Sequence, residues 1–142
     1  MSVEIKGKYE GELRVKLTHG PSQSVIETDA PADNQGKGAH FSPTDLLVAA
    51  LGSCMMTIMG IVAKRDGIKL EGTHFRGEKH MSENPRRIGK IVLEIYMPAG
   101  LTDKQKEKLE KFAHTCPVHQ SLHPDIEQDI KFIYDRSHHT IL

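Results

Sequence analysis

The chain has 142 residues, with 19 Lys and Arg against 19 Asp and Glu, so its formal net charge is zero when histidine is neutral. This length fits one domain with a sizeable core, and the even charge balance gives no electrostatic reason to expect nucleic acid or an anionic membrane as a partner. Two cysteines are too few for a disulfide-stapled secreted fold, and the N-terminus has no apolar signal segment. We therefore expect a cytoplasmic, globular protein with a single domain over residues 1–142.

The N-terminal part of the chain predicts a β-hairpin followed by an irregular loop. Apolar residues alternate with charged ones over residues 9–17, which predicts a strand, and residues 24–28 predict a second strand. A Gly-Pro pair within residues 19–22 marks the turn between them. Residues 30–41 are rich in Pro, Gly, Asp and Asn without periodicity, so we expect a loop that leads directly into a helix.

The strongest helix signal begins at Ser42 and ends near Gly67. Ser42 is a suitable N-cap, Pro43 suits the first helical position, and Asp45 places an acidic side chain in the first turn. Apolar residues cover nearly every side, so we expect this helix to be buried centrally, in the core or in a dimer interface. The spacing of three and four residues predicts that its main buried face carries Leu47, Ala50, Leu51, Cys54, Ile58, Ile61 and Val62.

The same segment raises the question of a membrane span. Residues 46–63 contain no formal charge over 18 positions, which is near the lower limit for a spanning helix. Gly, Ser and Thr interrupt the apolar run, no aromatic belt flanks it, and charges of both signs follow it. We therefore expect a buried helix and no membrane.

The rest of the chain predicts three strands and two further helices. Alternating patterns and turn signals predict strands over residues 68–80, 88–97 and 126–134. Thr102 and Gln105 form a capping-box pattern that begins a helix, and Pro117 begins a short one. The order of the main elements is β-β-α-β-β-α-β, an α+β domain whose sheet packs against the long apolar helix.

The two cysteines have different predicted surroundings. Cys116 precedes the short helix, where unpaired N–H groups favour a thiolate, although a small residue in a turn would fit the same pattern. Cys54 lies in the middle of the apolar helix, where burial alone would raise its pKa and leave an inert core residue. A reactive Cys54 would need a nearby cation, and the sequence does not choose among Arg14, Arg76, Arg86, Arg87 and Arg136.

Four potential metal ligands cluster near the second cysteine, namely His114, Cys116, His119 and His123. Their spacing is not that of a familiar zinc site, and no second pair of Cys or His completes a tetrahedral set. We therefore expect no metal. The His138–His139 pair is expected to lie in a solvated tail.

Two segments carry a specific pattern: residues 42–54, with the sequence Ser-Pro-Thr-Asp-Leu-Leu-Val-Ala-Ala-Leu-Gly-Ser-Cys, and residues 116–118, Cys-Pro-Val. Together they resemble the OsmC/Ohr family of osmotically induced and organic-hydroperoxide-resistance proteins. The resemblance covers nearly the whole chain. It implies an intertwined homodimer with long helices buried at its centre and two active sites at the subunit interface.

The resemblance also implies a thiol-dependent peroxidase that prefers organic hydroperoxides to hydrogen peroxide. Cys54 matches the peroxidatic cysteine, whose thiolate attacks the distal peroxide oxygen and becomes a sulfenic acid. Cys116 matches the resolving cysteine, which condenses with it to a disulfide that an external dithiol reduces. No metal or organic cofactor is required. The alternative is a small-molecule-binding or redox-sensing protein on the same fold.

One departure from the family pattern concerns the group that activates the thiolate. Many members place Glu at the position of Thr44, where it holds an Arg against the thiolate, and here the carboxylate comes one residue later, at Asp45. Neighbouring helical residues point about 100° apart, which argues against a direct substitution, so the candidate Asp45 and a site that lacks the family carboxylate both stay open. Arg14 is the candidate cation, with Lys37 as an alternative.

Overall fold

The computed structural model describes residues 1–134, so Arg136 and the His138–His139 pair lie outside the described residues. The chain forms two compact units, Met1–Leu47 and a second unit that begins at Val48. Both strands and helices are present, and the predicted α+β class is confirmed.

The first unit is a three-stranded antiparallel sheet in the order β1-β2-β3. Its strands are β1 (Ile5–Gly11), β2 (Arg14–His19) and β3 (Val25–Asp29), and a short 3-10 helix, η1 (Ala32–Asn34), follows them. The single strand predicted over residues 9–17 is wrong, because the chain reverses inside it. Gly11, Glu12 and Leu13 have φ values of 87°, 55° and 62°, a left-handed stretch that turns β1 into β2.

Most of the apolar side chains of this sheet share one face, with Val25 on the other. The register pairs Tyr9 with Val15 and Leu17 with Ile26, which places these residues on the same side. Tyr9 is 62% exposed and Ile26 is 51% exposed. The buried residues of the unit are all polar, namely Thr28, Asp29 and Ser42. The described part of the first unit therefore has no hydrophobic core of its own.

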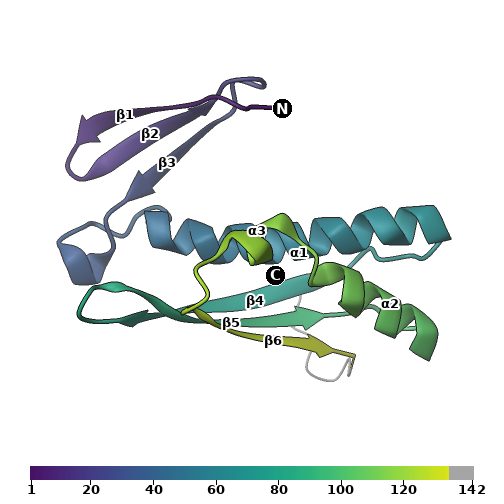
Figure 1. Cartoon of the computed structure of the whole chain (residues 1–142). Helices are drawn as coiled ribbons and strands as arrows, with labels where there is room; N and C mark the ends of the chain where they lie inside the picture. Colours follow the sequence, from purple (N-terminus) through teal and green to yellow (C-terminus); the bar gives the residue numbers. More distant parts are fainter. Residues whose placement is uncertain (135–142) are drawn as a thin grey trace. The chain divides into compact units, whose positions relative to one another are not determined.

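The second unit is built around α1 (Pro43–Asp66), whose first residues belong to the first unit. Figure 1 shows α1 lying along one face of a second sheet, which contains β4 (His74–Ser82), β5 (Arg87–Tyr96) and β6 (Glu127–Ile133). β4 and β5 are antiparallel, whereas β5 and β6 are parallel. A parallel pair needs a crossover connection, and α2 (Asp103–Ala113) with α3 (Pro117–Ser121) supplies it.

Most of the predicted elements of this unit are confirmed, with two changes in detail. The capping box of α2 is present: Thr102 Oγ1 accepts from the N–H of Gln105 at 3.1 Å, and the N–H of Thr102 donates to Gln105 Oε1 at 2.9 Å. The strand predicted from residue 68 begins only at His74, because the N–H of Thr73 donates to the carbonyl of Leu70 in a turn. Including the short helices, the order from β1 is β-β-β-η-α-β-β-α-α-β.

The hydrophobic core lies between α1 and the inner face of the second sheet. Ile91, Leu93 and Ile95 alternate along β5 and are fully buried. The buried residues of α1 are Val48, Leu51, Gly52, Met55, Met59, Val62 and Ala63. The predicted buried face is therefore partly wrong: Leu47 is 39% exposed and Ile61 is 59% exposed. Because the helix is apolar on every side, the spacing of its apolar residues does not identify which face is buried.

The core face of α1 is selected by a close contact between the helix and β4. A Cβ atom built on Gly52 would lie 2.5 Å from the ring of Phe75, and one built on Gly77 would lie 2.7 Å from a methyl group of Val48. Both glycines thus permit an approach that any other residue would block. By length and composition α1 also qualifies as a membrane-spanning helix, but a core helix of a soluble protein meets the same criterion.

Replacing Gly52 with alanine should lower the free energy of unfolding by about 1–3 kcal/mol, because the ring of Phe75 must move. The matched control is Gly60→Ala in the same helix, where a new Cβ would meet nothing within 4 Å. Better helix propensity should make that variant as stable as the wild type or up to about 1 kcal/mol more stable. Urea unfolding followed by circular dichroism measures both, and equal stability of the two variants would contradict the packing described.

Candidate functional site

The two cysteines come together in the second unit. Cys116 is the N-cap of α3, with Pro117 at the first helical position, and its Sγ accepts a hydrogen bond from the N–H of His119 at 3.2 Å. Cys54 is half-buried on α1 and packs against the core that contains Cys116. The two thiols are close enough for Cys54 to influence the pKa of Cys116, and both are free. The fold thus brings together two residues that are far apart in the sequence.

The environment of Cys116 favours the protonated thiol. Its side chain is fully buried, and this burial is the main reason that its pKa is raised. Hydrogen bonds from the backbone N–H groups of His119 and Val118 act in the opposite direction, whereas the contact with Cys54 raises the pKa further. The expected preference for thiolate at this helix terminus is therefore wrong in its net direction. A helix of five residues does not offset the loss of hydration.

A histidine and a glutamine lie beside Cys116. His119 Nδ1 and Gln128 Oε1 are 2.5 Å apart, and since an amide oxygen only accepts, Nδ1 is the donor in this hydrogen bond. The ring of His114 stands edge-on to that of His119, with centroids 5.6 Å apart. Within residues 1–134, no group of three or more His, Cys, Asp or Glu side chains is placed to hold a metal ion.

Asp45 lies in the first turn of α1, where it forms a reciprocal cap with Ser42. The N–H of Asp45 donates to Ser42 Oγ at 3.1 Å, and the N–H of Ser42 donates to Asp45 Oδ2 at 2.9 Å. Ser42 Oγ also lies 3.2 Å from Thr44 Oγ1. The predicted N-cap is confirmed, and the Asp45 carboxylate satisfies a backbone donor at the start of the helix. Its catalytic assignment stays a prediction.

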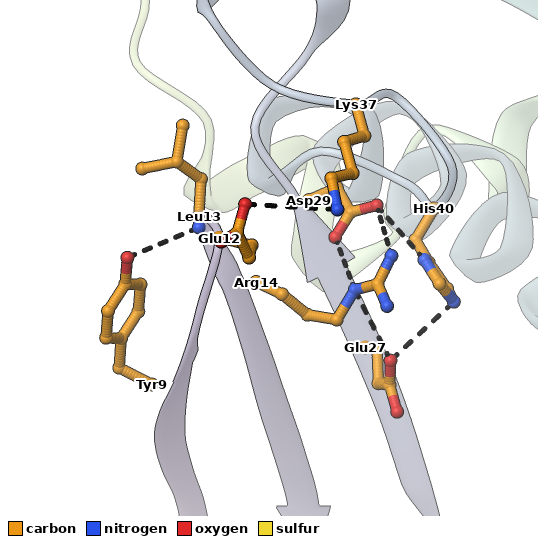
Figure 2. A network of polar contacts seen from close by, with 8 residues as sticks. All are labelled: Tyr9, Glu12, Leu13, Arg14, Glu27, Asp29, Lys37 and His40. Atoms are coloured by element: carbon orange, nitrogen blue, oxygen red, sulfur yellow. Dashed lines mark hydrogen bonds and ion pairs between the residues drawn. The ribbon is translucent and has the colours of Figure 1, made fainter.

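Arg14 belongs to a network of charged side chains in the first unit (Figure 2). Its Nε donates to Asp29 Oδ1 at 2.8 Å, and its Nη2 donates to Asp29 Oδ2 at 3.0 Å. His40 Nδ1 lies 3.1 Å from Asp29 Oδ2. Glu27 Oε2 is 3.7 Å from both Arg14 Nε and His40 Nε2. The hydrogen bonds from Arg14, followed by the one from His40, hold the pKa of Asp29 well below its usual range.

The other candidate cations have different surroundings. Arg76 pairs with Glu78 and Glu94, on the face of the second sheet that points away from α1 because Phe75 and Gly77 face the helix. Lys37 lies 3.9 Å from Glu12 in an exposed ion pair. Arg87 donates to the carbonyl of Ile88. Among the described residues, Arg14 is the candidate that a buried carboxylate holds in place.

Sequence reasoning missed Asp29 and His40, although a signal for Asp29 existed. The N–H of His19 donates to the carbonyl of Ser24 at 2.8 Å and closes the turn predicted there. Counting back along both strands from that turn places Arg14 directly opposite Asp29. His40 lies in the irregular loop, where no periodicity points to a partner.

Comparison with known proteins identifies the family. Residues 36–131 match the OsmC-like protein family. The chain belongs to this family. A structure of a Psychrobacter arcticus protein described in terms of osmotic stress induction and a detoxification response is 44% identical, with a TM-score of 0.88, covering 93% of this chain and 96% of that one. The predicted resemblance is confirmed.

More distant OsmC-like structures share the fold. An organic hydroperoxide resistance protein OsmC from Legionella pneumophila is 18% identical, with a TM-score of 0.75, covering 94% of this chain and 98% of that one. An organic hydroperoxide resistance protein from Elizabethkingia anophelis is 17% identical with a TM-score of 0.75, covering 95% and 97%. At this identity the likeness concerns the fold alone. No curated protein matches the chain.

The raised pKa of Cys116 leads to a pH prediction. In a Cys54→Ser variant, alkylation of Cys116 by iodoacetamide should accelerate about tenfold per pH unit and level off only above the ordinary thiol pKa of about 8.5, because burial still disfavours the thiolate. The same variant in urea is the control and should level off near 8.5. A plateau below pH 8 in the folded protein would contradict the described environment.

Proposed function

We propose that this OsmC-like protein is a thiol-dependent peroxidase that reduces organic hydroperoxides, and hydrogen peroxide more weakly. The observation that carries the proposal is the pair of free, neighbouring thiols with unequal burial. Cys54 is partly exposed and accessible to a substrate, whereas Cys116 is shielded from solvent and has Cys54 as its neighbour. Membership of the OsmC-like family and the names of the Legionella and Elizabethkingia proteins add support.

The proposed cycle uses both thiols and an external reductant. The Cys54 thiolate attacks the distal oxygen of the hydroperoxide, the O–O bond breaks, and the leaving alkoxide takes a proton to become an alcohol. Cys54 is then a sulfenic acid. Cys116 loses its proton and attacks the Cys54 sulfur, and the S–O bond breaks to release water and form the disulfide. An external dithiol returns two electrons and two protons, so no metal or organic cofactor takes part.

Arg14 and Asp45 are the proposed auxiliary residues. A cation that donates hydrogen bonds to a thiolate stabilises its charged form, and Arg14 keeps its charge at every physiological pH. We propose Asp45 as the carboxylate that replaces the family Glu missing at Thr44. Its capping contact with Ser42 supports a role in fixing the first turn of α1.

The two cysteines should give different kinetic defects. Cys54→Ser should abolish consumption of cumene hydroperoxide, because it removes the nucleophile. Cys116→Ser should permit one turnover and then stop at a sulfenic or over-oxidised Cys54. Stopped-flow consumption with a dithiol reductant, together with mass spectrometry of Cys54, measures both outcomes.

The same assay separates the proposal from its alternative. The wild type should lose two free thiols per chain and react faster with cumene hydroperoxide than with hydrogen peroxide. Equal residual activity in the two variants would contradict the assigned roles. No reaction, with both thiols still free, would favour a small-molecule-binding or redox-sensing protein.

We also propose that the chain acts as a homodimer, with residues 1–142 forming one functional domain. The first sheet exposes an apolar face and has no hydrophobic core of its own among its described residues, and a sheet of three strands needs such a face to be covered. The outward side of α1 also carries exposed Leu47 and Ile61. Single exposed apolar residues are normal on a protein surface, but these surfaces are more extensive. A second copy of the chain would cover them.

Light scattering after size exclusion should give about twice the mass of the 15.9 kDa chain. Ile61→Glu should shift the protein toward the monomer, because it places a charge on the outward apolar side of α1. Lys104→Glu, an exposed change of charge on α2, is the control and should leave the dimer intact. A wild type that runs as a monomer at micromolar concentration would contradict the proposal.

A further inference from the structure

We propose that Gln128 is a positioning residue that holds α3 in place through the ring of His119, so that Cys116 keeps the position from which it attacks oxidised Cys54. The inference deepens the proposed function and rests on Cys116 acting as the resolving thiol. Gln128 itself is assigned no contact with either thiol. The residues involved all belong to the second unit.

The first feature is the place of Gln128 on β6. The register pairs it with Ile91, which is fully buried on the core-facing side of β5. Alternation along β6 puts Gln128 on the same side as Ile130 and Phe132, which pack against the core. Apolar side chains prevail on this side of the sheet, so an amide in such a place needs a polar partner.

That partner is His119 of α3. Its Nδ1 donates to Gln128 Oε1, with 2.5 Å between the two atoms. The backbone of β6 is paired with β5 along the whole strand, so Gln128 stands on a well-supported element. The hydrogen bond therefore ties the His119 ring to the second sheet.

The second feature is a contact of the same histidine with the sulfur of Cys116. The backbone N–H of His119 donates to Cys116 Sγ at 3.2 Å. His119 thus reaches β6 with its ring and the thiol with its backbone. A displacement of His119 would carry the N–H donor away from the sulfur, so Gln128 acts on Cys116 through His119.

The third feature is the short length of α3. The helix has five residues, and an isolated helix of this length is not stable in water. Its place must come from contacts with the rest of the unit. Val118 and Leu122 pack against the core, but apolar contacts have no fixed direction. The hydrogen bond from His119 to Gln128 supplies that direction.

The orientation of α3 matters most when Cys116 attacks the Cys54 sulfenic acid. The new S–S bond forms as the S–O bond of Cys54 breaks, and a small misplacement of the attacking sulfur costs a large factor in rate. The same restraint keeps Cys116 fully buried and shields it until Cys54 has reacted. Release of α3 should therefore expose the thiol and slow the disulfide step at the same time.

The test compares Gln128→Leu with Gln128→Glu and Tyr134→Phe. Leucine fits a core-facing strand position but removes the acceptor, whereas glutamate keeps an acceptor oxygen for His119. Tyr134→Phe is the matched control. It also removes a side-chain hydrogen bond to the crossover, from the residue after β6 to Glu110 on α2, and leaves α3 untouched.

Two rates report the outcome. The first needs no peroxide: it is the alkylation of Cys116 by iodoacetamide at neutral pH in a Cys54→Ser background. The second is disulfide formation after one equivalent of cumene hydroperoxide, followed by mass spectrometry beside the oxidation of Cys54 itself. Urea unfolding measures the stability of each variant.

Gln128→Leu should alkylate about fivefold faster and form the disulfide about fivefold more slowly, as expected for the loss of one hydrogen bond. Oxidation of Cys54 should stay within about twofold of the wild type, which a general loss of stability would not spare. Gln128→Glu and Tyr134→Phe should stay within about twofold in every rate. A thiol that is easier to alkylate yet slower to form its disulfide has lost its position and not its reactivity.

Several results would overturn the inference. One is an unchanged alkylation rate in Gln128→Leu, and another is an equal acceleration in Tyr134→Phe. Faster alkylation with an unchanged disulfide step would mean that the attack does not depend on α3. A wild type that consumes no peroxide would refute the peroxidase proposal instead, while the alkylation rates still decide on Gln128. If Gln128→Leu fails to fold, wild-type rates in His119→Ala, which keeps the backbone donor, would overturn the inference.

Discussion

The close packing of α1 against β4 is the constraint on which the rest of the second unit depends. Gly52 and Gly77 allow the helix and the strand to approach until Phe75 and Val48 fill the space between them. This contact decides which side of an otherwise uniformly apolar helix faces the sheet. Because Met55 and Met59 are buried in the core, Cys54 lies at the edge of the buried side of the helix. The position of Cys54 is thus a consequence of the close packing at Gly52, two residues before it.

The same arrangement gives the two thiols unequal chemistry. Cys116 enters the core with the crossover that joins β5 to β6, so it is buried and its pKa is raised. Cys54 keeps partial access to solvent. A buried thiol with a raised pKa is a poor first nucleophile at neutral pH, but it is well protected until its neighbour is oxidised. The asymmetry is what the proposed cycle requires, in which Cys54 reacts first and Cys116 second.

Much of this fold could be predicted from the sequence where the signals are local. The capping box at Thr102, the N-cap at Ser42 and the strand near Ile91 all depend on neighbouring residues, and each is confirmed. The turn that separates β1 from β2 was missed because Leu13 continues the alternation of Val15 although its φ is positive. The buried face of α1 and the net direction of the Cys116 pKa were also mispredicted, because both depend on tertiary packing.

The charged network of the first unit illustrates a different limit. Sequence alone offered Arg14 as one of several cations, since nothing in the pattern ranks one arginine above another. The arginines differ in the burial of their carboxylate partners. The antiparallel register places the buried Asp29 opposite Arg14, whereas Arg76 is paired with exposed or half-exposed carboxylates. A buried ion pair costs free energy to desolvate and often adds little stability. The two hydrogen bonds between Arg14 and Asp29 therefore define the orientation of the guanidinium more clearly than they account for the stability of the first unit.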